Sequence, residues 1–129
     1  MEQRKLNKSE LALFSDFLTS LKTENVNLFW DCLSNRCKFL IETEAEDFKG
    51  KNKEEVLKLF KNKIGYELDS LGIANLIQFT NQEKTKGMGF LQSNVKTNIY
   101  YIQDTQIRGI EVPLEYENGE FKINILKKV

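Results

Sequence analysis

The spacing of apolar residues changes near Gly65, and this change constrains the fold more than any other feature of the sequence. Before Gly65, apolar side chains recur every three or four residues, as on one face of a helix. After it come stretches of β-prone residues separated by turn residues. Helices followed by strands indicate an α+β fold. We expect three N-terminal helices and a short first strand, packed on a curved antiparallel sheet of about four to five further strands, in one domain covering residues 1–129.

Three helices are predicted before Gly65. Ser9 suits the N-cap of the first, Thr23 or Asn25 that of the second, and Asn52 with Glu55 resembles a capping box for the third. The second helix is expected to end at Ser34-Asn35, and the third at Gly65. The apolar faces of the three helices are formed by Leu11, Phe14, Phe17, Leu18 and Leu21, by Val26, Phe29, Trp30 and Leu33, and by Val56, Leu57, Phe60 and Ile64.

The strands are predicted from alternation and turn signals. Residues 37–42 are typical of a short strand with Phe39 and Ile41 on one face. Later strands are expected at residues 73–80, 88–93, 97–103, 107–117 and 120–126. Asn118-Gly119 predicts a tight hairpin turn, because both turn residues need positive φ. Pro113 predicts an edge strand or a bulge, and Gly87-Met88-Gly89 a bend or bulge.

The composition excludes several kinds of chemistry. The chain has no His, and therefore no imidazole for a Ser or Cys triad or for a metal site. Basic and acidic residues balance at 19 each, and only Arg4, Arg36 and Arg108 offer a guanidinium, so we expect no nucleic-acid partner. Because no apolar run reaches signal-peptide or membrane-span length, we expect a cytoplasmic protein with reduced thiols and no membrane contact.

Two clusters invite a functional interpretation. Cys32 and Cys37 are spaced as C-x4-C, which without His supplies at most half a structural zinc site. We favour free buried thiols, with a reactive Cys between Arg36 and Lys38 as the alternative. The second cluster consists of four carboxylates: Glu42, Glu44, Glu46 and Asp47. Carboxylates can hold a hard cation, but the lysines that follow favour a charge-balanced, solvated connection. We therefore expect no metal and no cofactor.

Four stretches resemble the nuclear transport factor 2-like superfamily, also called the cystatin-like α+β cone. They are residues 17–25, 28–34, 48–56 with Phe60, and 112–123. The resemblance implies the cone fold but not one activity, because that fold hosts isomerases, dehydratases, cyclases and non-catalytic binding modules. In the ketosteroid isomerase branch the catalytic positions fall near Phe17, Ile41 and Val112, none of which can do that chemistry. The Asp–His pairs of the dehydratase and cyclase branches are absent from a chain without His.

Under that fold, a group of mostly aromatic side chains converges between helices and sheet, either as a filled core or as an apolar pocket. The candidates are Phe14, Phe17, Trp30, Ile41, Phe60, Phe90, Tyr101 and Val112. We expect a non-catalytic domain that binds an apolar small molecule or serves protein assembly, as a homodimer through the outer sheet face. Two alternatives stay open: a small isomerase or lyase using Glu111 or Asp104 with a Tyr, and a protein-interaction or immunity-type module.

Overall fold

The computed structural model describes residues 2–93 and 109–126 and confirms the α+β class, with the helices preceding a five-stranded antiparallel sheet. The helices are α1 (Lys8–Thr23), α2 (Val26–Asp31), α3 (Asn35–Thr43) and α4 (Lys53–Ile64), with the 3₁₀ helices η1 (Glu46–Phe48) and η2 (Gly65–Ser70). The strands are β1 (Gln3–Arg4), β2 (Leu71–Phe79), β3 (Lys86–Ser93), β4 (Gly109–Glu117) and β5 (Glu120–Ile123).

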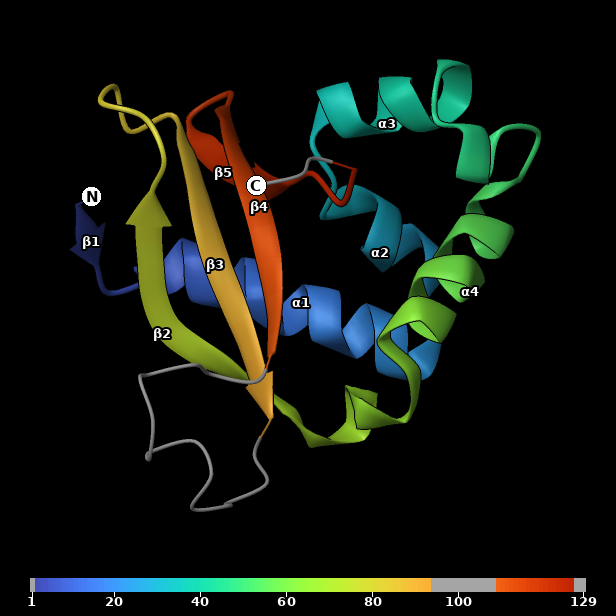
Figure 1. Ribbon diagram of the computed structural model, residues 1–129, viewed down its shortest axis with the longest axis horizontal. Coiled ribbons are helices and arrows are strands. Elements are labelled where there is room, and N and C mark those ends of the chain that lie inside the picture. Colours follow the sequence, from blue (N-terminus) through green and yellow to red (C-terminus); the bar gives the residue numbers. More distant parts are fainter. Residues whose placement is uncertain (1, 94–108, 127–129) are drawn as a thin grey trace.

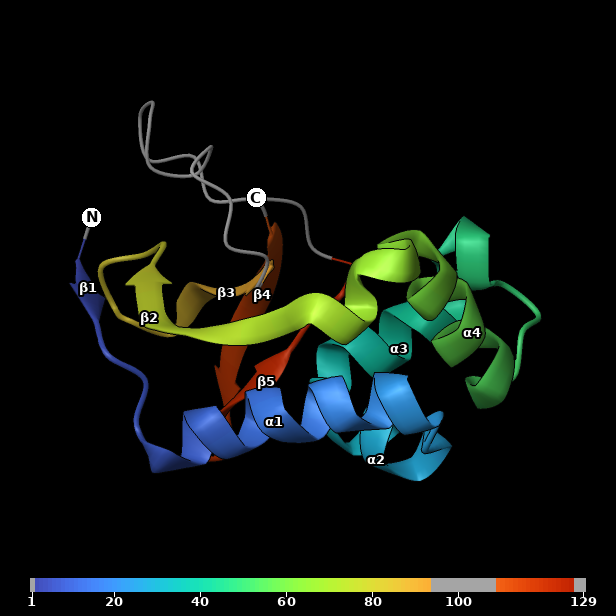
Figure 2. The same cartoon turned by 90° about the horizontal axis from the view of Figure 1, so that it is seen from below.

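The sheet is a curved meander in the order β1-β2-β3-β4-β5. The ring centroids of Phe79 on β2 and Phe121 on β5 lie 6.3 Å apart. In a flat sheet these strands would stand about 14 Å apart, three times the usual spacing, so the sheet must curl toward this contact. Helix α1 crosses one face of the sheet, while α2, α3 and α4 lie together at one side of the sheet (Figures 1 and 2). The buried side chains form a continuous core between α1, the other helices and the concave sheet face.

Polar caps fix where the helices begin. The predicted capping box at α4 is confirmed, because the Glu55 N–H donates to Asn52 Oδ1 at 2.8 Å and the Asn52 N–H donates to Glu55 Oε1 at 3.0 Å. Asn25 caps α2, as one of the two candidates for that position. The prediction of Ser9 as the cap of α1 is wrong. Asn7 holds that position and forms a capping box with Glu10.

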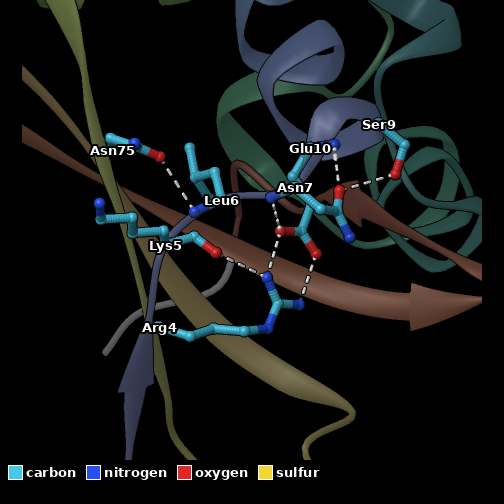
Figure 3. Close-up of polar contacts among 7 residues, drawn as sticks. All are labelled: Arg4, Lys5, Leu6, Asn7, Ser9, Glu10 and Asn75. Atoms are coloured by element: carbon cyan, nitrogen blue, oxygen red, sulfur yellow. Dashed lines mark hydrogen bonds and ion pairs between the residues drawn. The ribbon is translucent and has the colours of Figure 1, made fainter.

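The carboxylate of Glu10 also ties β1 to α1 (Figure 3). Arg4 Nη1 and Nη2 donate to its two oxygens at 2.6 and 2.7 Å, although only 3% of Glu10 is exposed. Burial alone would raise the pKa of Glu10, but the hydrogen bonds from Arg4 and the Asn7 N–H outweigh it and hold that pKa below its usual range. The Leu6 N–H donates to Asn75 Oδ1 on β2, so this N-terminal segment is anchored to both helix and sheet.

The prediction of a strand at residues 37–42 is wrong, because this segment belongs to α3. Ser34, expected to end the second helix, instead begins the third: its Oγ accepts the Cys37 N–H at 3.0 Å. Helical geometry then places Cys37 and Ile41 one turn apart on the buried face. Phe39 turns away from the core and is 59% exposed. A short apolar run does not distinguish a strand from a helix. The N-cap at Ser34 is the local feature that identifies this segment as a helix.

Most of the predicted strands are found, with the hairpin between the last two. Asn118 and Gly119 have φ of 51° and 85°, as the tight turn requires. The strand predicted at residues 97–103 lies outside the described residues. Glycines 87 and 89 lie in a regular register with both β2 and β4, whereas the irregularity of the β2–β3 pair lies between Ile73 and Ile77, directly beyond the residue that pairs with Gly89. The bend or bulge predicted at Gly87-Met88-Gly89 is therefore displaced onto β2.

Pro113 lies on a strand with neighbours on both sides, which corrects the prediction of an edge strand or bulge. Its carbonyl accepts the Asn124 N–H at 3.0 Å, one residue past the end of β5. In an antiparallel pair the N–H and C=O of one residue point to the same neighbour. The missing N–H of Pro113 therefore faces the place where β5 has ended, and only the last bond of the ladder is lost.

The free side of β5 is covered by the link between α2 and α3. The Ser34 N–H donates to the Ile123 carbonyl at 2.8 Å, and the Ile123 N–H donates to the Cys32 carbonyl at 2.9 Å. Leu33 thereby forms a parallel bridge with Ile123. This link satisfies backbone groups that an uncovered edge strand would offer to another chain.

Gly89 allows α1 to lie close to the sheet. A Cβ added to Gly89 would stand 2.2 Å from Cζ of Phe14, whose side chain is fully buried. At Gly87 an added Cβ would meet the Ile77 side chain at 3.0 Å. The neighbours of Gly89 on β3 point to the opposite sheet face, which we call the outer face.

We expect Gly89→Ala to lower the free energy of unfolding by about 1 to 3 kcal/mol, because the methyl group overlaps a ring that has no space to move into. Urea unfolding would measure the loss. Replacing an ordinary strand glycine by Ala is usually favourable, so a loss is diagnostic.

Phe14→Leu provides the control, because the shorter side chain makes room for the methyl group. In a double-mutant cycle, Gly89→Ala should cost less in the Phe14→Leu background than in the wild type. An equal cost in both backgrounds would contradict the proposed contact.

Candidate functional site

The structure places most of the predicted pocket residues in a packed core. Five of the eight are buried: Phe14, Phe17, Trp30, Ile41 and Val112. The Phe17 ring lies 6.0 Å from that of Phe29 and 5.8 Å from that of Phe60, measured between centroids. These aromatic side chains fill the space between α1, α2 and α4.

The other three candidates lie elsewhere. Phe90 follows Gly89 on β3 and lies on the outer sheet face, half-buried, so it does not converge with the other candidates. Tyr101 lies outside the described residues. Phe60 is half-buried, and besides packing on the core it lines an open pocket at the surface.

This pocket has a volume of about 530 Å³ and lies between α3, η1, α4 and the segment that follows β5. Its apolar lining is supplied by Leu40, Ala45, Phe48, Phe60, Ile125 and Leu126. All of these except Phe48 are half-buried, so they present apolar surface to solvent. Charged residues complete the lining: Glu44, Glu46, Asp47 and Lys63. A concave apolar surface with a few charged groups at its rim is typical of a binding site.

A buried polar network connects two walls of the pocket. The Ser34 hydroxyl donates to Glu115 Oε2 at 2.9 Å, and Asn124 Nδ2 donates to Glu115 Oε1 at 3.1 Å. Asn124 Oδ1 in turn accepts the Leu126 N–H at 3.0 Å. Ser34 caps α3, which carries Leu40, so Glu115 on β4 sets the separation between α3 and the segment ending in Leu126. The sequence does not reveal this network, because a strand at residues 37–42 leaves Ser34 without a helix to cap.

Both cysteines are free and buried, as favoured from the sequence. Burial raises the pKa of Cys32 to about 12, with a smaller contribution from Asp16. Burial likewise raises the pKa of Cys37 to about 11, although the N–H groups of Ile125 and Leu126 oppose it. The thiols are therefore protonated at neutral pH, which argues against a nucleophile or metal ligand here.

The acidic connection after α3 is charge-balanced in part by α4. Asp47 Oδ2 lies 3.5 Å from Lys63 Nζ, and Lys63 lies over the Phe48 ring at 5.4 Å from its centroid. Within the described residues, no group of three or more Cys, Asp or Glu side chains is arranged to hold a metal ion. Glu111 is exposed on β4, and Asp104 lies outside the described residues.

Comparisons with known proteins add no assignment: no family model matches the chain, and neither a curated protein nor a solved structure matches it. In the part of the chain that the structure describes, no helix has the length and apolar character needed to cross a membrane.

The raised thiol pKa values predict a loss of stability at alkaline pH. Unfolding exposes thiols that ionise above about pH 9, whereas the folded thiols ionise near pH 11 and 12. This contribution to stability is complete below pH 9 and falls as the pH rises, because the unfolded state then binds fewer protons. We expect a loss of about 1 to 4 kcal/mol between pH 8.5 and pH 11 in urea unfolding.

The Cys32→Ala/Cys37→Ala variant is the control, because its stability should depend less steeply on pH over the same interval. Thiol labelling at pH 8 gives an independent measurement: both cysteines should react in denaturant and resist labelling in the folded protein. Rapid labelling of the folded protein would contradict the burial.

Proposed function

We propose that this chain is a non-catalytic binding domain whose ligand places an apolar group in the pocket between α3, α4 and the segment after β5. The observation that carries the proposal is the half-buried apolar lining of a concavity of about 530 Å³. That volume falls in the range usual for ligand sites. The charged rim residues would orient what binds. An apolar small molecule and a segment of a protein partner both meet this description.

Binding has more support than catalysis. The chain lacks His, both thiols have a raised pKa, and Arg4 holds the pKa of the buried Glu10 below its usual range. An isomerase or lyase of the kind considered from the sequence needs a carboxyl shielded from water with a raised pKa. The pocket carboxyls, Glu44, Glu46 and Asp47, are exposed. An interaction or immunity-type module remains compatible with the pocket, which is open enough for a peptide.

We also propose a relationship to the nuclear transport factor 2-like fold. Its support is the order of the elements, with helices first and a curved antiparallel meander ending in the hairpin at Asn118-Gly119. Helix α3 departs from that pattern, because it occupies the place of the family's first strand. A cytoplasmic location is proposed on the two free thiols.

Leu126→Asp should weaken binding of Nile red, a neutral dye that fluoresces in apolar surroundings, by about ten-fold or more, because a charge would enter the apolar lining. Leu11→Asp on α1 is the matched control: Leu11 is an exposed leucine outside the pocket lining, and its replacement should leave the affinity unchanged. Fluorescence titration measures both. Dye binding that is unsaturable, or equal in the two variants, would contradict the pocket proposal.

We further propose that the chain forms a homodimer through the outer sheet face. Met88 pairs with Pro113 there, and Phe90 lies next to Met88 on the same strand face. Met88 and Pro113 are themselves buried, so the apolar surface that these three residues offer to a second copy is that of the half-buried Phe90.

Phe90→Lys should therefore convert the dimer to a monomer in light scattering coupled to size exclusion, because a lysine would be desolvated at the interface. Phe39→Lys on α3 is the control, since Phe39 is more exposed than Phe90 and lies away from the sheet face. A wild-type protein that elutes as a monomer at high concentration would refute this proposal and leave the pocket proposal intact.

A further inference from the structure

We infer that the pocket binds a basic segment of another protein, in which an apolar side chain is flanked by Lys or Arg. This inference rests on the proposed function of the pocket and names its partner. The first support is local charge. Among the residues that the structure describes, three carboxylates and one ammonium line the pocket, a net charge of −2, whereas the whole chain is neutral with 19 residues of each sign. Charge complementarity of this kind steers and orients a partner.

The rim carboxylates differ in whether they already have a partner. Asp47 pairs with Lys63, but Glu44 and Glu46 make no ion pair within the described part of the chain. Both are exposed and border the apolar lining. An incoming cation can therefore pair with them without breaking an existing contact or being buried. Pairs of this exposed kind contribute modestly to affinity and mainly set orientation.

The protein itself shows how the pocket receives a cation. Lys63 Nζ lies 5.4 Å from the centroid of the Phe48 ring and 3.5 Å from the Asp47 carboxylate. An aromatic face beside a carboxylate is a favourable site for an ammonium or guanidinium group. Because half of the Lys63 side chain is exposed, a Lys or Arg of a partner can share this site or replace Lys63.

The shape of the pocket favours a chain segment over an enclosed small molecule. Five of its six apolar residues are only half-buried, and they come from α3, the link between α3 and η1, α4 and the segment after β5. A groove of this kind leaves one side of its ligand in water. A peptide satisfies that condition: one apolar side chain can contact Leu40, Phe60 and Leu126, while its neighbours reach the rim.

Selection of a phage-displayed random peptide library on the full chain would test the inference. Peptides that also bind the Leu126→Asp variant are removed first, so that the remainder depend on the pocket. We expect the enriched peptides to carry Lys or Arg beside an apolar residue. Because the selection uses the wild-type chain, any effect of the positive charges of Lys127 and Lys128, which follow Leu126 in the sequence, is part of the result.

Charge reversal at the rim gives the quantitative result. For one enriched peptide, Glu44→Lys/Glu46→Lys should weaken binding in fluorescence anisotropy by about ten-fold, because two attractions become repulsions. The matched control is Asp69→Lys/Glu83→Lys, which reverses two exposed carboxylates outside the pocket lining and should leave the affinity unchanged. Affinity for the wild type should also fall as salt is added.

The outcomes separate this inference from the function on which it rests. Enriched peptides that are uncharged or acidic, yet still compete with Nile red, would overturn the basic partner and leave the pocket as a binding site. If the two charge-reversal variants change the affinity for the peptide equally, the basic partner is likewise overturned and the pocket remains a binding site. If no peptide distinguishes the wild type from Leu126→Asp, and the dye does not either, both proposals fail.

Discussion

The contact between Phe14 and Gly89 sets the distance between α1 and the sheet, and the rest of the core follows from that distance. The Phe14 ring occupies the space that a Cβ on β3 would need, so the helix lies directly on the strand. Closely packed interiors leave little room for adjustment around such a ring. Two residues along β2 from Ile77, which pairs with Gly89, Phe79 meets Phe121 across the curled sheet. The aromatic residues that suggested an internal cavity thus serve to fill the core.

A second constraint is the buried carboxylate of Glu115, which is 8% exposed. Burying a charged group costs free energy unless hydrogen bonds compensate it. Ser34 and Asn124 supply those bonds, and Lys86 and Lys122 stand opposite Glu115 on the neighbouring strands. The same bonds join the start of α3 to the segment after β5. The sheet therefore shapes a pocket whose described lining residues all lie outside the strands.

Signals from neighbouring residues in the sequence predict the fold class. Contacts between distant residues determine the features that the sequence does not show, such as the helix at residues 37–42 and the direction of Phe90. The capping box at Asn52 and the turn at Asn118-Gly119 depend on neighbouring residues, and both were predicted correctly. The segment at residues 37–42 is ambiguous in isolation, and Ser34, which the sequence places at the end of the second helix, caps the start of α3. Nothing in the sequence distinguishes Phe90 from a core aromatic such as Phe14. Its position next to Gly89 on β3 shows that Phe90 points to the outer sheet face, away from Phe14.

The pocket was beyond prediction from the sequence for the same physical reason. Its lining combines residues of α3 and α4 with Ile125 and Leu126, which are far apart in the chain and are joined through buried hydrogen bonds. In a strand, Leu40 would lie on the face opposite to that of Phe39 and Ile41, whereas α3 presents it to the pocket.

The position of the pocket also limits its chemistry. It lies at the margin of the core, where its carboxyls contact water, while the nucleophilic thiols are enclosed and have a raised pKa. Catalysis by proton transfer or by a nucleophile depends on the opposite arrangement, with the reactive group tuned and open to the substrate. Apolar surface bordered by fixed charges instead provides affinity and orientation. The distribution of buried and exposed groups therefore suits recognition of a partner better than transformation of a substrate.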